Sequence, residues 1–172
     1  MKRLFPLLAT TVLLSAAPAI AADTPTDPQI AHIAYTAGSL DVAAAKQALG
    51  KTHNKSVRDF AQQMVRDHEA VNKQALALLK KLKVTPKDNE TSRALARDAA
   101  VKQKVRSKLK GAEFDQAYVN NEVAYHKTVN NSLETTLIPS ASNAELKSLL
   151  QTGLNVFQGH EQHAEQVAAE LK

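Results

Sequence analysis

The stretch that decides the fold is residues 56–82, SVRDFAQQMVRDHEAVNKQALALLKKL. Its apolar side chains recur at alternating spacings of three and four residues, which is the period of one face of an α-helix. That face comprises Val57, Ala61, Met64, Val71, Ala75, Leu78 and Leu82. His68 takes the position at which the pattern would place a leucine. The stretch therefore predicts a long amphipathic helix, from about Asn54 to Lys83, with one ionisable group in its apolar face.

Three further segments show the same helical period. They run from about Asp27 to Gly50, from about Glu113 to Leu137, and from about Asn143 to the C-terminus. The apolar face of the last segment is expected to comprise Leu146, Leu149, Gly153, Val156, His160, Ala164, Val167 and Leu171. Long segments lack the alternation of every second residue that marks a strand. The sequence therefore predicts an all-α fold.

A polar stretch, Lys87 to Lys110, connects the second and third predicted helices. Its few apolar residues, among them Leu95 and Val105, predict a weaker helix or two lying across the bundle. One long connection between the second and third helices, with short ones elsewhere, is typical of ferritin-like four-helix bundles. The basic run from Lys102 to Lys110 is either a solvated face or a surface for acidic envelope partners.

The start of the chain has the features of a secretory signal peptide. Two basic residues precede an apolar run, residues 4–20, which two prolines interrupt. The triplet Ala19-Ile20-Ala21 matches the small-x-small pattern that signal peptidase reads. A membrane anchor is the alternative, which the interrupted run disfavours. We expect a signal peptide over residues 1–21 and a single domain over residues 22–172, exported to the periplasm of a Gram-negative cell envelope, with no later transmembrane segment.

Composition excludes several functional classes. Loss of Lys2 and Arg3 with the signal peptide lowers the formal net charge of +5 by two, so a dedicated nucleic-acid binder is not expected. The chain has no cysteine, which excludes disulfides, thiolate metal ligands and a lipidated cysteine. It also lacks a glycine-rich phosphate loop and a G-x-S-x-G nucleophile elbow. No enzyme class is indicated, and the oligomeric state stays open.

Four ionisable residues fall near the midpoints of their predicted helices: Asp41, His68, His126 and His160. Each residue of a helix rises about 1.5 Å, and midpoints of antiparallel helices share one height whichever way each helix points. A histidine in an apolar stripe is costly unless it has a partner. We therefore expect these four side chains to meet in one layer inside the bundle.

Such a layer is suited to a transition-metal ion. Imidazole nitrogen and carboxylate oxygen together suit Zn²⁺, Cu²⁺ or Fe²⁺. Three histidines with Asp41 make a plausible shell for a single ion, to which Glu122 can add an oxygen and His163 a nitrogen. Asp67 and Glu161 point off the apolar faces, where supporting contacts or solvent suit them better.

The alternative is a metal-free polar layer. Buried histidines can instead hydrogen-bond to Asp41, Glu122, Tyr118 or Tyr125. Two functions follow from these two possibilities. The first is a periplasmic metal-binding bundle for metal holding or stress tolerance, and the second is an envelope interaction or chaperone-like protein without a metal.

Several stretches resemble the DUF4142 family, whose members are often labelled predicted outer membrane protein. The stretches are SLDVAAAKQAL, SVRDFAQQMVRDHEAVNKQALALLKKL, GAEFDQAYVNNEVAYHKTV and GHEQHAEQ. The most specific pieces are Phe60-Ala61, Asp67-His68, Phe114-Asp115, Tyr118 and His126. The resemblance spans Asp27 to Lys172 and implies an exported, ferritin-like four-helix domain without a defined activity. It also implies that Asp41 (usually glutamate in the family), His68, His126 and His160 are polar core positions.

A ferroxidase-type oxidase is the third hypothesis, and the ligand pattern disfavours it. Di-iron bundles take a glutamate from each of two helices and a Glu-x-x-His motif from each of the other two. Here the spacings are Glu122-x-x-x-His126 and His160-x-x-His163, so no helix carries that motif. A histidine-rich site for one ion fits the sequence better.

Overall fold

Residues 24–172, the part of the chain that this computed structural model describes, fold into helices and their connections. The elements are α1 Asp27–Leu49, α2 Lys55–Leu82, α3 Glu90–Ser107, α4 Gly111–Ser132, the π-helix η1 Leu133–Leu137, α5 Ile138–Ser140 and α6 Ala144–Glu170. The predicted all-α class is confirmed for these residues. The predicted signal peptide, residues 1–21, lies outside them.

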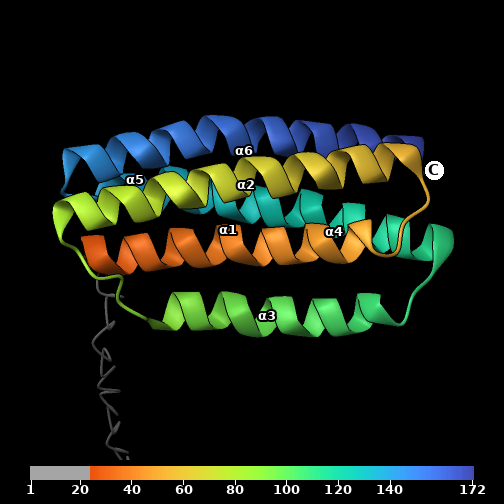
Figure 1. The fold of residues 1–172 in the computed structure, drawn as a ribbon, viewed down its shortest axis with the longest axis horizontal. Coiled ribbons are helices and arrows are strands. Elements are labelled where there is room, and N and C mark those ends of the chain that lie inside the picture. The colour runs from red at the N-terminus through yellow and green to blue at the C-terminus, as the bar shows by residue number, and fades with distance from the viewer. Residues whose placement is uncertain (1–23) are drawn as a thin grey trace, which may run out of the picture.

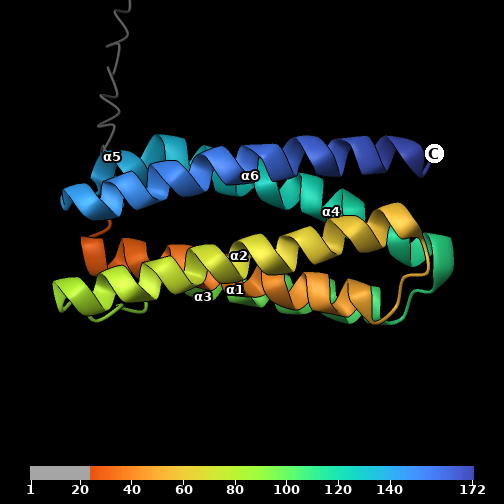
Figure 2. The same cartoon turned by 45° about the horizontal axis from the view of Figure 1, so that its top comes forward.

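The long helices form two antiparallel pairs. α1 packs along α2, and α4 packs along α6, while α2 also contacts α6 and α1 contacts α4 (Figure 1). The turned view shows the α4–α6 pair lying over the α1–α2 pair (Figure 2). α3 returns the chain to the end of the molecule where α1 finishes, so that α2 and α4 run in the same direction (Figure 1).

The connection between α2 and α4 differs from the prediction. It contains one helix, α3, which runs along α1 rather than across the bundle (Figure 1). The physical reason is that α3 has too little apolar surface for a core position. Leu95 and Ala99 are only half-buried, and Val101 and Val105 are 64% and 57% exposed. α3 therefore covers one edge of α1 and leaves most of its own surface in solvent.

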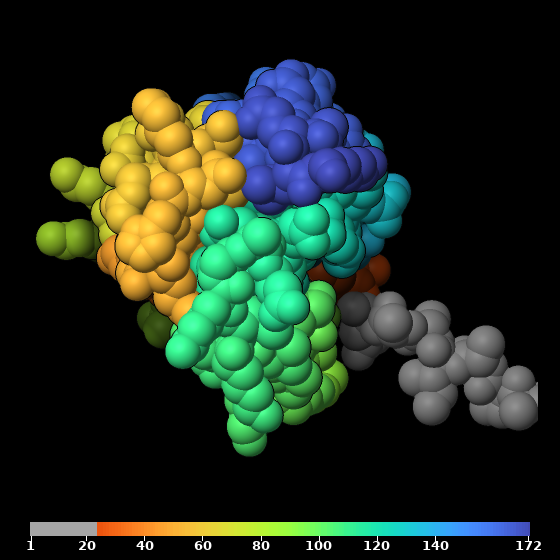
Figure 3. Space-filling model, turned by 90° about the vertical axis from the view of Figure 1, so that its right-hand side faces the viewer, coloured from red at the N-terminus to blue at the C-terminus, as the bar shows by residue number. Residues whose placement is uncertain are grey.

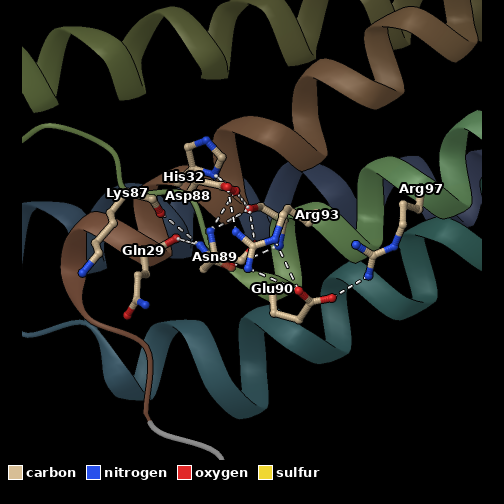
Figure 4. A network of polar contacts seen from close by, with 9 residues as sticks. Gln29, His32, Lys87, Asp88, Asn89, Glu90, Arg93 and Arg97 are labelled. Carbon is tan, nitrogen blue, oxygen red and sulfur yellow. Dashed lines mark hydrogen bonds and ion pairs between the residues drawn. The ribbon is translucent and has the colours of Figure 1, made fainter.

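Hydrogen bonds fix the start of α3 beside the first turns of α1 (Figure 4). The backbone N–H of Lys87 donates to the carbonyl oxygen of Pro28 at 2.9 Å. The side-chain amide of Asn89 donates to the backbone carbonyl oxygen of Gln29 at 3.3 Å. Asn89 also caps α3, because its side-chain oxygen accepts from the backbone N–H of Ser92 at 3.0 Å. The surrounding ion pairs, such as Arg93 with Asp88, are exposed and add little stability.

Two apolar clusters fill the interior, one toward each end. The Phe60 cluster comprises Ala44, Ala45, Ala48, Val57, Phe60, Ala61, Met64, Phe114, Tyr118, Val119, Ala164 and Val167. The Leu146 cluster comprises Ile30, Ile33, Leu133, Leu137, Ala141, Leu146, Leu150 and Phe157. Figure 3 looks onto the end near the Phe60 cluster, where the α1–α2 connection, the start of α4 and the C-terminal end of α6 meet.

The helix predicted from Glu113 to Leu137 is not uniform. α4 ends at Ser132, and the π-helix η1 and the short α5 follow it. Pro139 lies in α5 and has no backbone N–H, and its ring crowds the carbonyl group one turn earlier. The wider turn of η1 lies just before this proline.

Asp27 links the first helix to the start of the last. Its carboxylate accepts from the backbone N–H groups of Ser142 and Asn143 at 2.8 and 2.9 Å. We expect Asp27→Ala to lower the free energy of unfolding by about 1–3 kcal/mol, because two backbone donors lose their partner. Asp59→Ala is the control, since Asp59 pairs only with Lys55 one turn away, and should change it by less than about 0.5 kcal/mol. Urea denaturation followed by circular dichroism measures both, and equal losses would contradict the assigned role of Asp27.

Candidate metal centre

A polar layer separates the two apolar clusters. On each of α1, α2, α4 and α6, the residues on one side of the layer pack with the Phe60 cluster and those on the other side with the Leu146 cluster. The flanking pairs are Ile33 and Ala44 around Asp41, Met64 and Val71 around His68, Val119 and Val129 around His126, and Phe157 and Ala164 around His160. All four polar residues are buried, as predicted.

Asp41 is the centre of this layer. Its Oδ2 lies 3.0 Å from Nε2 of His68 and 3.4 Å from Nε2 of His126. These atoms are close enough for ion pairs but are not aligned for hydrogen bonds, so both Asp41 oxygens lack a hydrogen-bond partner. The ring of His160 lies 5.2 Å from that of His68 and 5.4 Å from that of His126, measured between centroids. The three imidazoles thus surround a common point beside the carboxylate.

Two hydrogen bonds orient the imidazoles. Nδ1 of His126 contacts the carbonyl oxygen of Glu122 at 3.0 Å, and Nε2 of His160 contacts Oδ2 of Asp67 at 2.9 Å. A carbonyl or ionised carboxylate oxygen only accepts, so each of these ring nitrogens carries the proton. The opposite nitrogens, Nε2 of His126 and Nδ1 of His160, therefore keep a lone pair. Neither of these two atoms has a hydrogen-bond partner. The two ring nitrogens of His68 have none either.

Two sets of side chains have the proximity that a metal ion requires. In His68, His126 and His160, one potential ligand atom from each residue lies within 4.8 Å of the others. The same holds for Asp41, Glu122 and His126. Five of the six predicted ligands are therefore brought together, and His126 belongs to both sets.

His163, the sixth predicted ligand, belongs to neither set. Its Nδ1 lies 2.8 Å from the side-chain oxygen of Gln63, and its ring packs edge-on against Phe60 at 5.2 Å between centroids. Three residues along a helix displace a side chain by nearly one turn and rotate it by about 60° from the starting face. That displacement moves His163 out of the polar layer toward the Phe60 cluster.

Burial and the short contacts set the charges in the layer. Burial raises the pKa of Asp41, but the imidazoles of His68 and His126 outweigh this effect and bring that pKa to about 2. Burial, with Asp41 nearby, raises the pKa of Glu122 well above its usual range. Burial lowers the pKa of His126, and it lowers the pKa of His160 to about 4. Near pH 7 the layer thus contains the Asp41 carboxylate, and the lowered pKa values of His126 and His160 favour their neutral, metal-binding forms.

The sequence did not identify Phe157 as a neighbour of the layer, and it left open whether Asp67 makes a supporting contact or faces solvent. Phe157 stacks on His68 with ring centroids 4.6 Å apart and an interplanar angle of 12°. The predicted face of the last helix ran through Leu149 and Val156, whereas the structure buries Leu150 and Phe157. Asp67 contacts His160 on another helix, which no periodicity can reveal. The signal for Phe157 was its position three residues before His160, on the same helical face.

A protein-family model matches most of this chain. The matching family model is described as a domain of unknown function (DUF4142) and covers residues 13–167. The chain belongs to this family. No curated protein and no solved structure matches it. Membership agrees with the resemblance seen in the sequence and assigns no activity to the DUF4142 domain.

A small cavity brings solvent close to the carboxylate side of the layer of this DUF4142 domain. It has a volume of about 100 Å³ and lies between α1, α3 and α4. Asp41 and Glu122 line its inner part, and half-buried Tyr125 and exposed Gln103 line it farther out. The cavity gives an ion an approach beneath α3.

Within residues 24–172, no helix combines the length and apolar character needed to cross a bilayer.

The lowered pKa of His160 predicts acid sensitivity of the metal-free DUF4142 domain. The folded state resists protonation of this imidazole until about pH 4, whereas the unfolded state takes up the proton below about pH 6.5. Stability from the neutral imidazole is therefore present at pH 7.5 and falls as the pH drops through that window.

We expect His160→Gln to lose less of its free energy of unfolding between pH 7.5 and pH 5 than the wild type, by about 2 kcal/mol. Both proteins retain Asp41, Glu122 and His126, so the difference reports His160. Denaturant unfolding at both pH values, in the presence of a chelator, measures it. Identical pH dependence in the two proteins would show that His160 is not held neutral by burial.

Proposed function

We propose that this protein is an exported component of the Gram-negative cell envelope that binds one transition-metal ion in the interior of a ferritin-like four-helix bundle. The bundle comprises α1, α2, α4 and α6, and α3 is the long crossover. The role is metal holding or tolerance of metal stress in the periplasm. The observation that carries the proposal is the convergence of three buried imidazoles from three helices beside one buried carboxylate.

The unpartnered atoms of the layer support a metal ion rather than a metal-free network. Buried polar groups in proteins are nearly always hydrogen-bonded. Here both nitrogens of His68, Nε2 of His126 and Nδ1 of His160 are buried without such a partner. An imidazole that carries one proton has one lone-pair nitrogen of the type that Zn²⁺, Cu²⁺ or Fe²⁺ accepts, so each of the three side chains can offer one ligand atom. A bound cation would satisfy all three side chains at once.

The carboxyl groups have separate roles in this proposal. Asp41 is ionised and touches two of the imidazoles, so it supplies a negative ligand beside them. Burial and the nearby Asp41 raise the pKa of Glu122 well above its usual range; Glu122 lines the cavity beneath α3, where it can add an oxygen when it ionises. Asp67 is a positioning residue that holds His160. A di-iron bundle takes a glutamate from each of two helices and a Glu-x-x-His motif from each of the other two, and this sequence contains no Glu-x-x-His motif. A site for one ion is therefore favoured over a di-iron oxidase.

Removal of two imidazoles tests the proposal. We expect wild-type protein to bind about one equivalent of Zn²⁺, Cu²⁺ or Fe²⁺, the last under anaerobic conditions. His68→Ala/His126→Ala should weaken binding more than about 100-fold, since loss of supporting contacts alone costs about 10–100-fold. His53→Ala is the matched control, because His53 is exposed in the α1–α2 connection and should leave binding unchanged. Equilibrium dialysis with elemental analysis measures the stoichiometry and affinity.

The same experiment separates the two main functions. Equal binding by the wild type and the double variant would place the ion elsewhere and overturn the proposed site. A wild type that holds none of the three ions would leave the layer as a metal-free structural element and favour the envelope-interaction function. Circular dichroism of each variant confirms that the helical fold is retained.

Asp67 offers a finer test of how His160 is held. We expect Asp67→Asn to weaken metal binding about 10-fold, because an amide accepts the Nε2 proton less strongly and lowers the basicity of Nδ1. Asp59→Asn, on the exposed face of the same helix, serves as the control. Isothermal titration with the preferred ion measures both affinities. An unchanged affinity in Asp67→Asn would remove Asp67 from the proposed site.

A further inference from the structure

A second cavity lies within the Leu146 cluster, on the opposite side of the polar layer from the Phe60 cluster. Its volume is about 160 Å³, and α1, α2, α3, α4, η1 and α6 all contribute to its lining. Phe157 lines it and also stacks on His68, so this ring lies between the cavity and the imidazoles. The cavity is thus separate from the smaller one that reaches Asp41 and Glu122.

Small side chains at facing positions create the space. Ala37 on α1, Ala75 on α2 and Gly153 on α6 all line the cavity. A Cβ atom built on Gly153 would lie 3.4 Å from the ring of Phe157 and 4.0 Å from Val71, which is ordinary contact. The glycine is therefore not required by a close approach of the neighbouring helices. Larger residues at these positions would fill the interior, and their absence leaves it open.

The polar atoms around this cavity do not favour water. No lining residue is among those with a buried polar atom that lacks a hydrogen-bond partner. The amide of Asn72, one of the few polar lining groups, already donates to the hydroxyl of Ser39 at 3.4 Å. Water in a cavity needs two to four polar partners, whereas an apolar cavity of about 150 Å³ stays dry and takes up benzene or xenon.

We propose that this cavity binds a compact, uncharged apolar group about the size of a benzene ring. The volume and the aliphatic and aromatic lining select for that size and against a charged ligand, whose desolvation nothing in the cavity would offset. A free small aromatic molecule and the end of a short acyl chain share this chemistry. The inference does not depend on metal binding, because no proposed ligand of the ion lines the cavity.

Thermal unfolding of the full domain tests the inference with benzene and, separately, with octanoate, whose apolar chain end would enter the cavity while its carboxylate stays in solvent. We expect at least one of them to raise the Tm of the wild type by about 3–6 °C at a concentration tenfold above its dissociation constant. Ala37→Leu places three further carbon atoms in the cavity and should abolish the shift. Ala124→Leu, at an exposed position of α4 outside the cavity, is the matched control and should retain it.

Each outcome decides the question. A shift with benzene alone assigns the site to free rings, and a shift with octanoate alone assigns it to chain ends. Contacts between ligand protons and the methyl groups of Leu133 and Leu150, detected by NMR in the wild type, should accompany either shift. If Ala37→Leu does not fold, Ala75→Leu fills the same cavity. No shift with either compound, or an equal shift in the filled variant, overturns the inference.

Discussion

The contact between the Asp41 carboxylate and the His68 imidazole is the constraint on which the rest of the structure depends. The Asp41 side chain is fully buried, and a buried charge is costly unless groups of opposite or compensating character lie against it. Asp41 and His68 lie side by side at only one relative shift of α1 and α2 along their axes. His126 and His160 then have to reach the same height from α4 and α6, so that four helices are aligned by one polar layer rather than by apolar packing alone.

This layer divides the interior into two regions with different properties. Toward the end near Phe60, aromatic and small aliphatic residues fill the interior. Toward the other end, the helices leave a largely apolar cavity behind Phe157. The ring of Phe157 lies between that apolar space and the imidazoles, and burial lowers the pKa values of His126 and His160. The proposed metal site and the proposed apolar site are therefore adjacent but chemically separate.

Much of the helical organisation follows from periodicity, as particular residues show. The starts of α1 and α2 and the path of α2 from Val57 to Leu82 agree with the pattern of apolar residues, and so does the central position of the four polar residues. The prediction for α3 was wrong in orientation, because its weak apolar pattern does not say which neighbour it covers. The helix leading to Pro139 was expected to be regular, because the spacing of apolar residues does not reveal the wider turn at η1.

The sequence by itself determined the helical class, the family and the placement of Asp41, His68, His126 and His160 at mid-helix, since each depends only on local period and residue type. The tertiary structure alone decided that His160 is held by Asp67, that Phe157 rather than Val156 faces the layer, and that His163 lies outside it. The physical reason is that these contacts join different helices. Their geometry depends on the rotation and axial shift of each helix, to within less than one turn, and the hydrophobic period does not specify these so finely.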